Sequence, residues 1–353
     1  MNTASIGQVY SARLKSGEEV VVKVQRPGIQ QTIETDILWL EKLVRDLEKM
    51  SPGLKTFDIL GIIQEFKIAV LKELDYTNEA RNALKFAEGM KGIPEVTIPK
   101  VYKNLSGLKV LTMQKIHGVK ITEAEKVGSD KTILARIALR SVFSMVFEFG
   151  FFHADPHPGN IFALPGNRIA FLDLGMVGRL DESMRYKLAD LILAVLERDV
   201  EGVSRILLTM GIRQGRVIPQ QFQRDIGAMM DKVIGLPIED IHFSEIVKDL
   251  MDGARRNQLK IPSEYTLMGK ALMTVEGVGK ALDPTLNIEA EIAPYIQHLV
   301  KMRFAPKRIS RALFNRMIQM YHWSNDLPYH LMNILDDLQG GNLFFRMNFH
   351  RDA

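Results

Sequence analysis

The spacing of apolar residues in the first quarter of the chain predicts a β-hairpin followed by helices. Two β-rich runs, residues 9–14 and 19–24, flank the turn-forming residues 15–18. Residues 33–49 carry apolar side chains at helical spacing, which predicts an amphipathic helix. A longer helix is expected over residues 58–86, whose first residue, an aspartate, is the expected N-cap.

Helix, hairpin and helix again are predicted for the rest of the chain. The strongly apolar run at residues 131–149 predicts a buried helix that Asp130 caps and Gly150 ends. A second hairpin is expected over residues 161–172. Beyond Asp181 the pattern is mostly helical.

The composition is that of an ordinary globular protein. The 353 residues are 46% hydrophobic and 25% charged, and they suffice for two lobes with a sizeable core. The sequence has no cysteine, which excludes a disulfide and fits a reducing compartment. A net charge of +4 is too small to indicate nucleic-acid binding. No apolar run approaches the roughly 20 residues that a membrane-spanning helix needs.

Residues 153–160, His-Ala-Asp-Pro-His-Pro-Gly-Asn, carry the strongest candidate chemistry, together with Asp173-Leu174-Gly175. Protein kinases use the same order: H-R-D, then N, then D-F-G. Asp155 stands in the catalytic-base position, beside the attacking hydroxyl. Asn160 and Asp173 offer the oxygen ligands that Mg²⁺ prefers. Several matches at fixed spacing favour a kinase-like interpretation over an accidental one.

Zinc is the alternative for the two histidines of this loop. Pro156, Pro158 and Gly159 exclude a helix, whereas the H-E-x-x-H arrangement requires one. We therefore expect His153 to support the loop by hydrogen bonding rather than to form a zinc pair with His157.

Lys23 follows three valines in the second strand, where kinases have V-A-I-K. An ammonium between valines needs a partner, and the α- and β-phosphates of ATP would serve; a solvent-facing lysine is the alternative. The strand expected over residues 109–118 would lead into a hinge, where backbone groups near Gln114 to Ile116 would contact adenine.

The segment before the first strand matches a glycine-rich phosphate loop only in part. Of G-x-G-x-x-G-x-V, Gly7 and Val9 match, whereas Asn2 and Ala4 stand at the first two glycine positions. Glycine lets the backbone approach phosphates, and an alanine narrows the conformations open to the loop.

Three carboxylates lie close together in the expected second helix: Glu73, Asp75 and Glu79. Asp75 and Glu79 would lie one turn apart on one face. Acids on a surface helix are commonly solvated, but in a kinase one glutamate of this helix pairs with the strand lysine. We expect Glu79 to pair with Lys23, with Glu73 as the alternative.

Four strings together resemble the UbiB family of atypical kinase-like proteins, which is linked to ubiquinone biosynthesis. They are Ala4-Ser5-Ile6-Gly7-Gln8-Val9, Val22-Lys23-Val24-Gln25-Arg26-Pro27-Gly28, Glu73-Leu74-Asp75-Tyr76, and residues 153–160 with Asp173-Leu174-Gly175. An alanine-containing loop in place of the glycine-rich one is a mark of this family. The resemblance covers most of the chain.

The resemblance implies a set of site residues. The loop residues Ala4, Ser5, Ile6, Gly7 and Val9 would contact the nucleotide, and Lys23 its phosphates. Glu79 would be the ion-pair partner of the lysine, and Glu73 and Asp75 the extra acidic motif of the family. Asp155 would be the catalytic base, with Asn160 and Asp173 on Mg²⁺.

The resemblance also implies an activity: an ATPase, or a kinase of restricted scope, that uses ATP or ADP with Mg²⁺ and supports quinone synthesis at a membrane. Members usually carry an N-terminal extension with a K-x-G-Q motif, and many bacterial ones end in spanning helices. The sequence shows neither, so we expect a chain trimmed at both ends.

We therefore expect an α+β, protein-kinase-like, two-lobed fold with a small sheet N-lobe, inserted helices and a large helical C-lobe. The expected parts are an N-lobe at 1–117, a C-lobe at 118–250 and a helical region at 251–353. A basic stretch opens at Lys301 and fits either an anionic membrane surface or a solvated helix face. We expect a cytoplasmic, membrane-associated protein whose partners are nucleotide, anionic lipids and quinone-biosynthesis proteins.

Two other functions share part of this pattern. Small-molecule phosphotransferases of the aminoglycoside or choline type have a similar H-x-D-x-H-P-x-N loop, but not usually the other strings. A scaffold that binds nucleotide without turnover is the second. An ordinary Ser/Thr kinase is disfavoured, because the stretch from Leu174 to Leu180 leaves little room for an activation segment.

Overall fold

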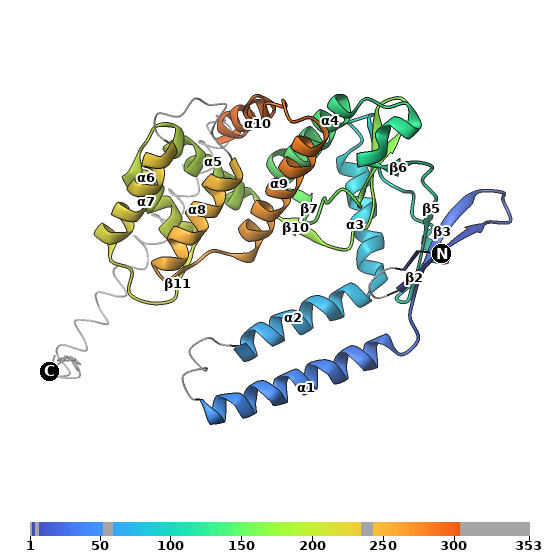
Figure 1. Cartoon of the computed structure of the whole chain (residues 1–353), viewed down its shortest axis with the longest axis horizontal. Coiled ribbons are helices and arrows are strands. Elements are labelled where there is room, and N and C mark those ends of the chain that lie inside the picture. The colour runs from blue at the N-terminus through green and yellow to red at the C-terminus, as the bar shows by residue number, and fades with distance from the viewer. Residues whose placement is uncertain (1, 4–6, 52–58, 234–242, 304–353) are drawn as a thin grey trace, which may run out of the picture. The chain divides into compact units, whose positions relative to one another are not determined.

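A four-stranded antiparallel sheet holds the N-terminal part of the chain. The computed structural model describes residues 2–3, 7–51, 59–233 and 243–303. The predicted first hairpin is confirmed as β2 (Gly7–Arg13) and β3 (Glu19–Gln25). β5 (Val110–Gln114) pairs with β3, and β1 (Asn2–Thr3) pairs with β2, giving the order β1-β2-β3-β5 (Figure 1).

The helix predicted over residues 58–86 is wrong, because the structure has two helices there. α2 (Ile59–Leu74) ends before Asp75, and α3 (Tyr76–Gly89) begins after it. The Asp75 carboxylate accepts a hydrogen bond from the Thr77 N–H at 2.9 Å, and this local bond competes with a continuous helix. Asp75 is thus the N-cap of α3 and does not share a helix face with the residue one turn on. The expected cap at position 58 lies outside the described residues.

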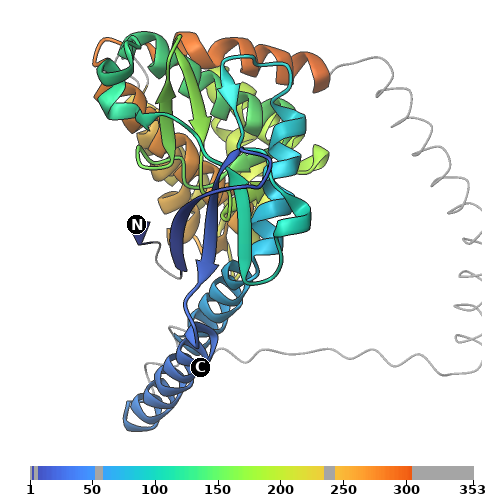
Figure 2. The same ribbon diagram turned by 90° about the vertical axis from the view of Figure 1, so that its right-hand side faces the viewer.

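Two antiparallel helices, α1 (Ile29–Met50) and α2, connect β3 to α3 along the chain. α1 begins four residues before the predicted position and runs alongside α2 in both views (Figure 1, Figure 2). Ile37 and Val44 of α1 pack with Ile63 of α2 as a small apolar cluster separate from the main core. The apolar spacing therefore predicted the helix, and its pairing with α2 buries Ile37 and Val44, whereas Leu40 and Leu47 on the same helix stay exposed.

The main core lies around a long buried helix. The helix predicted over residues 131–149 is confirmed as α4 (Lys131–Phe143), which continues as the π-helical turn η4 (Ser144–Phe149). Asp130 caps it by accepting the Ile133 N–H at 3.1 Å, and Gly150 ends it with a left-handed φ of 65°. Phe143 and Phe147 are buried in this core, which anchors the strand that follows.

Short strands, most of them after α4 in the chain, frame the candidate catalytic loops. The second predicted hairpin is confirmed, and its two strands belong to a sheet of order β4-β9-β8-β6. A separate antiparallel pair is formed by β7 and β10. The bounds are β4 (Val96–Thr97), β6 (Val119–Lys120), β7 (Phe151–His153), β8 (Ile161–Leu164), β9 (Arg168–Phe171) and β10 (Val177–Arg179).

Helices make up most of the remainder, as predicted. They are α5 (Glu182–Leu196), α6 (Val200–Met210), α7 (Pro219–Val233), α8 (Phe243–Arg256), α9 (Ser263–Leu282) and α10 (Ile288–Arg303). Short elements complete the chain: η2 (Lys103–Leu105), η3 (Ile121–Val127), β11 (Ile212–Arg213) and β12 (Leu259–Lys260). The pairing of β11 with β12 was not predicted. α9 packs against α4 and also contacts β10, so it reaches the catalytic loops.

The described residues thus confirm the α+β class, with a small sheet followed by a largely helical region. Within them, no helix combines the length and the apolar character needed to cross a membrane. Of the basic stretch that opens at Lys301, everything from residue 304 on lies outside the described residues.

Candidate active site

Lys23 lies at the centre of the candidate site. It stands on the inner strand β3, opposite Val9 of β2 and Leu111 of β5. Its Nζ lies 2.9 Å from Oε2 of Glu79 and 3.4 Å from Oδ1 of Asp173. The structure therefore brings together a lysine, a helix carboxylate and a loop carboxylate that are far apart in the sequence.

The expected partner of Lys23, Glu79 rather than Glu73, is the one that the structure places against it. Glu79 lies in the first turn of α3, which Asp75 caps. In the described part of the chain, the ion pairs of Lys23 are with Glu79 and Asp173 and not with Glu73. Partial burial and the nearby negative charge of Asp173 raise the pKa of Glu73, against the pull of Lys23. Glu73 therefore lies close enough to Asp173 and Lys23 to feel their charges, but it does not form an ion pair with the lysine.

The Lys23–Glu79 pair is buried, and removing two charged groups from water costs free energy. The side chains are only 12% and 5% exposed. Burial lowers the pKa of Lys23, but Glu79 and Asp173 outweigh it and raise that pKa, so the ammonium stays charged. Burial also raises the pKa of Glu79, against the pull of the lysine. Oε1 of Glu79 is buried and has no hydrogen-bond partner among the described residues, which leaves an acceptor free for a further group.

The backbone of Asp173 adopts an unusual conformation. Its φ is 52°, a left-handed conformation that non-glycine residues rarely adopt and aspartate tolerates better than most. Its side chain is 55% exposed, so one side of the carboxylate is open. The Leu172 N–H donates to the Asn160 carbonyl at 2.8 Å, which sets Asn160 beside the start of the Asp173 segment.

The segment after Asp173 is tied to α3. The side-chain amide of Asn82 donates to the Leu174 carbonyl at 2.9 Å, and this bond is buried. Asn82 lies one turn after Glu79 on the same helix. The helix that carries Glu79 and the loop that carries Asp173 are therefore held together.

The loop at 153–160 has no helix, as the prolines predicted. The Asn160 side-chain amide donates to the Asp155 carbonyl at 3.2 Å, and the His157 N–H donates to the same carbonyl at 2.8 Å. The Gly159 N–H donates to Nδ1 of His157 at 3.0 Å. These short-range bonds hold the loop in one conformation. They use the backbone carbonyl of Asp155 and leave its side-chain carboxylate available for contacts outside the loop.

His153 links the two candidate catalytic loops, in the supporting position expected for it. It is fully buried, its Nδ1 accepts the Asp155 N–H at 3.2 Å, and its Nε2 lies 3.3 Å from the Leu172 carbonyl. Nε2 therefore carries the proton and donates it to that carbonyl. Burial lowers the pKa of His153 to about 4, so the ring is neutral. Among the described residues, no cluster of three or more His, Cys, Asp or Glu could hold a metal ion.

The chain turns back quickly after Asp173. The Ala154 N–H donates to the Met176 carbonyl at 3.1 Å, and the Leu180 N–H to the Gly150 carbonyl at 2.9 Å. β10 thereby pairs directly with β7, and α5 follows. The short connection predicted from the sequence is confirmed, and it contains no long activation segment.

The predicted nucleotide-loop residues are only partly described. Ala4, Ser5 and Ile6 lie outside the described residues, whereas Gly7 and Val9 stand on β2. A Cβ at Gly7 would lie 2.8 Å from the Val24 carbonyl oxygen, so the close approach of the two strands requires a glycine there.

At the expected hinge, neighbours already use two of the backbone donors. The Gln114 N–H donates to the Lys100 carbonyl at 2.8 Å, and the Lys115 N–H to the Glu19 carbonyl at 3.1 Å. A contact with adenine through these residues would have to come from carbonyl groups or from Ile116.

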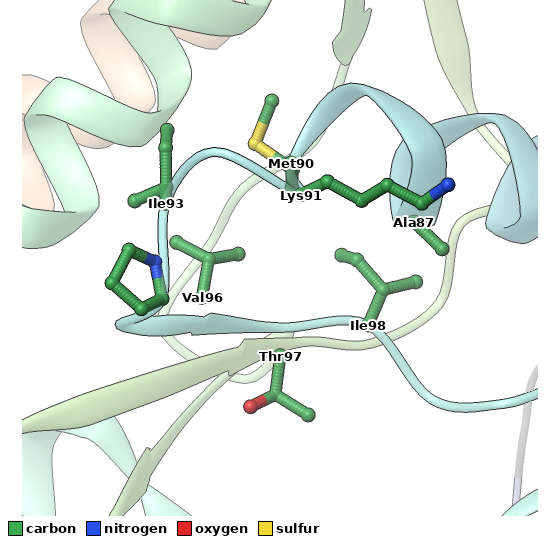
Figure 3. Close-up of a pocket in the computed structure, with 8 residues that line it drawn as sticks. Ala87, Met90, Lys91, Ile93, Val96, Thr97 and Ile98 are labelled. Atoms are coloured by element: carbon green, nitrogen blue, oxygen red, sulfur yellow. The ribbon is translucent and has the colours of Figure 1, made fainter.

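A pocket of about 290 Å³ lies elsewhere, between the end of α3 and β4 (Figure 3). Its walls are mostly apolar and include Met90, Ile93, Val96 and Ile98. None of the predicted site residues lines it, so the pocket is separate from the candidate active site.

Sequence reasoning missed one contact of the site. Nζ of Lys270, on α9, lies 3.0 Å from Oδ1 of Asp155. No motif surrounds Lys270, and only the packing of α9 against α4 and β10 brings it to the candidate catalytic loop. Spacing along the chain could not have shown it.

Comparison with known families agrees with the geometry. Residues 1–207 match the ABC1 atypical kinase-like domain, and residues 226–287 match the UbiB helical domain. The chain belongs to the ABC1/UbiB family of atypical kinase-like proteins. The match to the first domain contains the strand lysine, α3 and both catalytic loops, and the match to the second contains Lys270.

Named relatives support the UbiB assignment. The chain is 32% identical over 329 residues to the probable protein kinase UbiB of Pseudomonas paraeruginosa, covering 91% of this chain and 62% of that protein. It is 32% identical over 330 residues to the protein of the same name from Pseudomonas fluorescens, covering 92% of this chain and 62% of that protein. The chain thus spans less than two thirds of the length of these relatives.

A solved structure confirms the kinase-like fold of this UbiB-family chain. The structure of Rv3197 from Mycobacterium tuberculosis, in complex with erythromycin, matches this chain with a TM-score of 0.59 and 26% sequence identity. The likeness covers 80% of this chain and 72% of that one.

Proposed function

We propose that this chain binds Mg-ATP and transfers or hydrolyses its terminal phosphoryl group, as an atypical kinase or ATPase. The observation that carries the proposal is the convergence of Lys23 with Glu79 at 2.9 Å and with Asp173 at 3.4 Å. A buried lysine between a helix carboxylate and a loop carboxylate is the arrangement that kinases need for phosphate binding.

The residues fit a magnesium-bound nucleotide. The carboxylate of Asp173 is about half exposed. The hydrogen bond from the Leu172 N–H to the Asn160 carbonyl holds Asn160 next to the residues that lead into Asp173. Both offer the oxygen ligands that Mg²⁺ takes, and this ion commonly relies on one or two protein ligands with phosphate oxygens for the rest. The unpartnered Oε1 of Glu79 adds an acceptor at the same place.

Each residue then has a separate role in phosphoryl transfer. Lys23 binds the α- and β-phosphates, and Glu79 holds the lysine in position. Asp155 orients the attacking hydroxyl or water and accepts its proton as the new oxygen–phosphorus bond forms. Asn160 and Asp173 would hold Mg²⁺, which would neutralise negative charge on the phosphates when bound. His153 fixes the backbone of Asp155 against the loop that leads to Asp173.

The biological role we propose is support of isoprenoid-quinone synthesis at a membrane, with ATP or ADP as the nucleotide. The UbiB name of the relatives supports the quinone connection. The basic stretch from Lys301 supports contact with anionic lipids, since interleaved basic and apolar residues suit such a surface. Proteins of quinone biosynthesis are the expected macromolecular partners.

ATP turnover by the purified chain tests the activity. Phosphate release is measured with Mg-ATP, with and without anionic liposomes, for the unaltered protein, Asp173→Asn and the control Asp46→Asn. Asp46 is an exposed carboxylate on α1 that pairs with Lys49, so its removal changes charge away from the site. We expect Asp173→Asn to abolish turnover and Asp46→Asn to retain it. Full activity in Asp173→Asn would refute the assignment.

The same preparation separates the other two functions. A phosphorylated product from a screen of amino-sugars and amino-alcohols would favour a small-molecule phosphotransferase. A melting temperature that Mg-ATP raises, without turnover under any condition, would favour a nucleotide-binding scaffold, because binding alone stabilises the folded state.

A further inference from the structure

The carboxylate of the proposed catalytic base has a cationic partner from outside the kinase-like motifs. Lys270 Nζ lies 3.0 Å from Asp155 Oδ1, and the two side chains are 48% and 33% exposed. Lys270 belongs to α9, within the region that matches the UbiB helical domain. A residue of that domain therefore touches the group expected to accept the proton.

Lys270 is held in place by a well-packed helix. Leu272 and Val275, on the opposite side of α9, are buried in the main core, which α4 also joins. Near the start of the helix, the Tyr265 hydroxyl donates to the Met184 carbonyl at 3.1 Å and ties α9 to α5. The backbone of Lys270 is consequently fixed, and only its side chain can move.

The catalytic loop cannot supply this positive charge itself. Residues 153–160 contain no lysine or arginine. Lys23 is already engaged by Glu79 and Asp173. A cation beside the Asp155 carboxylate therefore has to come from another element, and α9 provides it.

We propose that Lys270 is the cation on the acceptor side of the transferred phosphoryl group, supplied by the helical domain to complete the active site. This inference rests on the proposed phosphoryl transfer. An ammonium has three N–H donors, so Lys270 can hold Asp155 and donate to a phosphoryl oxygen at the same time.

The chemistry needs such a group at this place. The oxygen of water or of a hydroxyl attacks the γ-phosphorus, the bond to the bridging oxygen of ADP breaks, and Asp155 takes the proton of the attacking oxygen. Negative charge stays on the three equatorial oxygens of the phosphoryl group throughout. In the transition state the phosphoryl group has moved from ADP toward the acceptor, so a donor on the acceptor side stabilises it more there than in bound ATP.

A purely structural ion pair would behave differently. Pairs this exposed contribute little to stability, so a merely structural Lys270 should be replaceable without effect on turnover. A transition-state role requires that kcat fall while the affinity for Mg-ATP stays the same.

The first test compares Lys270→Met, Lys270→Arg and the control Lys280→Met in ATP turnover. Lys280 is on the same helix and pairs with Glu276 of that helix, so its replacement removes the same charge from α9. We expect Lys270→Met to lower kcat by about 100-fold, the usual loss for one transition-state donor, with KM for ATP within about twofold. Lys270→Arg should restore part of kcat, since the charge remains, and Lys280→Met should stay near the unaltered protein.

A second readout does not depend on turnover. Affinity is measured by calorimetry for Mg-ADP alone and for Mg-ADP with fluoroaluminate, a mimic of the phosphoryl group in flight. We expect Lys270→Met to bind Mg-ADP normally and to lose the extra affinity that fluoroaluminate gives to the unaltered protein.

The outcomes separate this inference from the function on which it rests. If the unaltered protein neither binds Mg-nucleotide nor turns it over, the proposed function is refuted and the inference with it. If the unaltered protein is active and Lys270→Met keeps both kcat and the fluoroaluminate effect, the function stands and the role of Lys270 is refuted. Equal losses in Lys270→Met and Lys280→Met would likewise overturn it, because they would reflect damage to α9.

Discussion

Acid should destabilise this protein through His153, the buried ring between the catalytic loops. The ring is fully buried, and its pKa is lowered from 6.5 to about 4 because burial disfavours the imidazolium. Between these two pH values the unfolded chain binds a proton at His153 that the folded chain does not. The contribution of this residue to folding stability is therefore complete above pH 6.5 and is lost as the pH falls toward 4.

The size of the effect follows from the two pKa values. A difference of about 2.5 units corresponds to a limit of about 3 kcal/mol, at 1.36 kcal/mol per unit. Because the titration is only partly complete at pH 5, the expected loss between pH 7.5 and pH 5 is about 2 kcal/mol. Because the His153 side chain is not exposed to solvent, screening by water does not reduce this free-energy difference.

Urea unfolding at pH 7.5, 6.5, 5.5 and 5.0 measures this loss, with His153→Gln as the paired variant. Glutamine keeps a donor for the Leu172 carbonyl but does not titrate. Carboxylates contribute equally to both proteins, so the difference between their free energies of unfolding isolates the ring. We expect the unaltered protein to lose about 2 kcal/mol more than the variant over this range. Parallel pH dependence in the two proteins would refute the account of a neutral, buried His153.

Two further predictions concern the elements that position the site. Asp75→Ala should lower the free energy of unfolding by about 1 kcal/mol, the usual value of an N-cap, because the Thr77 N–H loses its acceptor. Asp75→Asn should recover most of this loss. Denaturant unfolding measures both variants, and an alanine variant as stable as the unaltered protein would contradict the capping role. Gly178→Ala should cost about 1–3 kcal/mol, because a Cβ on β10 would overlap the Phe152 ring that packs beneath it; a thermal melt identical to that of the unaltered protein would show that the ring can move aside.

Local patterns accounted for much of the fold. The hairpin of β2 and β3, the buried helix capped by Asp130, and the hairpin of β8 and β9 were all predicted, because each is specified by its own apolar spacing and end signals. The catalytic loop was likewise predicted to lack a helix, since prolines fix that locally.

The rest depended on competition and on tertiary contact. The break at Asp75 was missed because apolar residues continue on both sides of it, and the cap that interrupts the helix is made by one side chain, whose Oδ1 accepts from the Thr77 N–H and hydroxyl. Glu79 was correctly expected as the partner of Lys23, but Glu73 stayed an alternative, because the sequence did not show where α3 begins. The contact of Lys270 with Asp155 arises only from the packing of α9, and no local pattern records it.

The buried bond from Asn82 to the Leu174 carbonyl bears on how such a protein can be switched on and off. Swinging α3 outward would separate Glu79 from Lys23 only by breaking this bond too, leaving two desolvated polar groups without partners. If the bond held instead, the displacement would drag the loop after Asp173 along with the helix. An inactive state reached by rotating this helix is therefore disfavoured, because a contact outside the ion pairs also holds Glu79 and the loop after Asp173 in place.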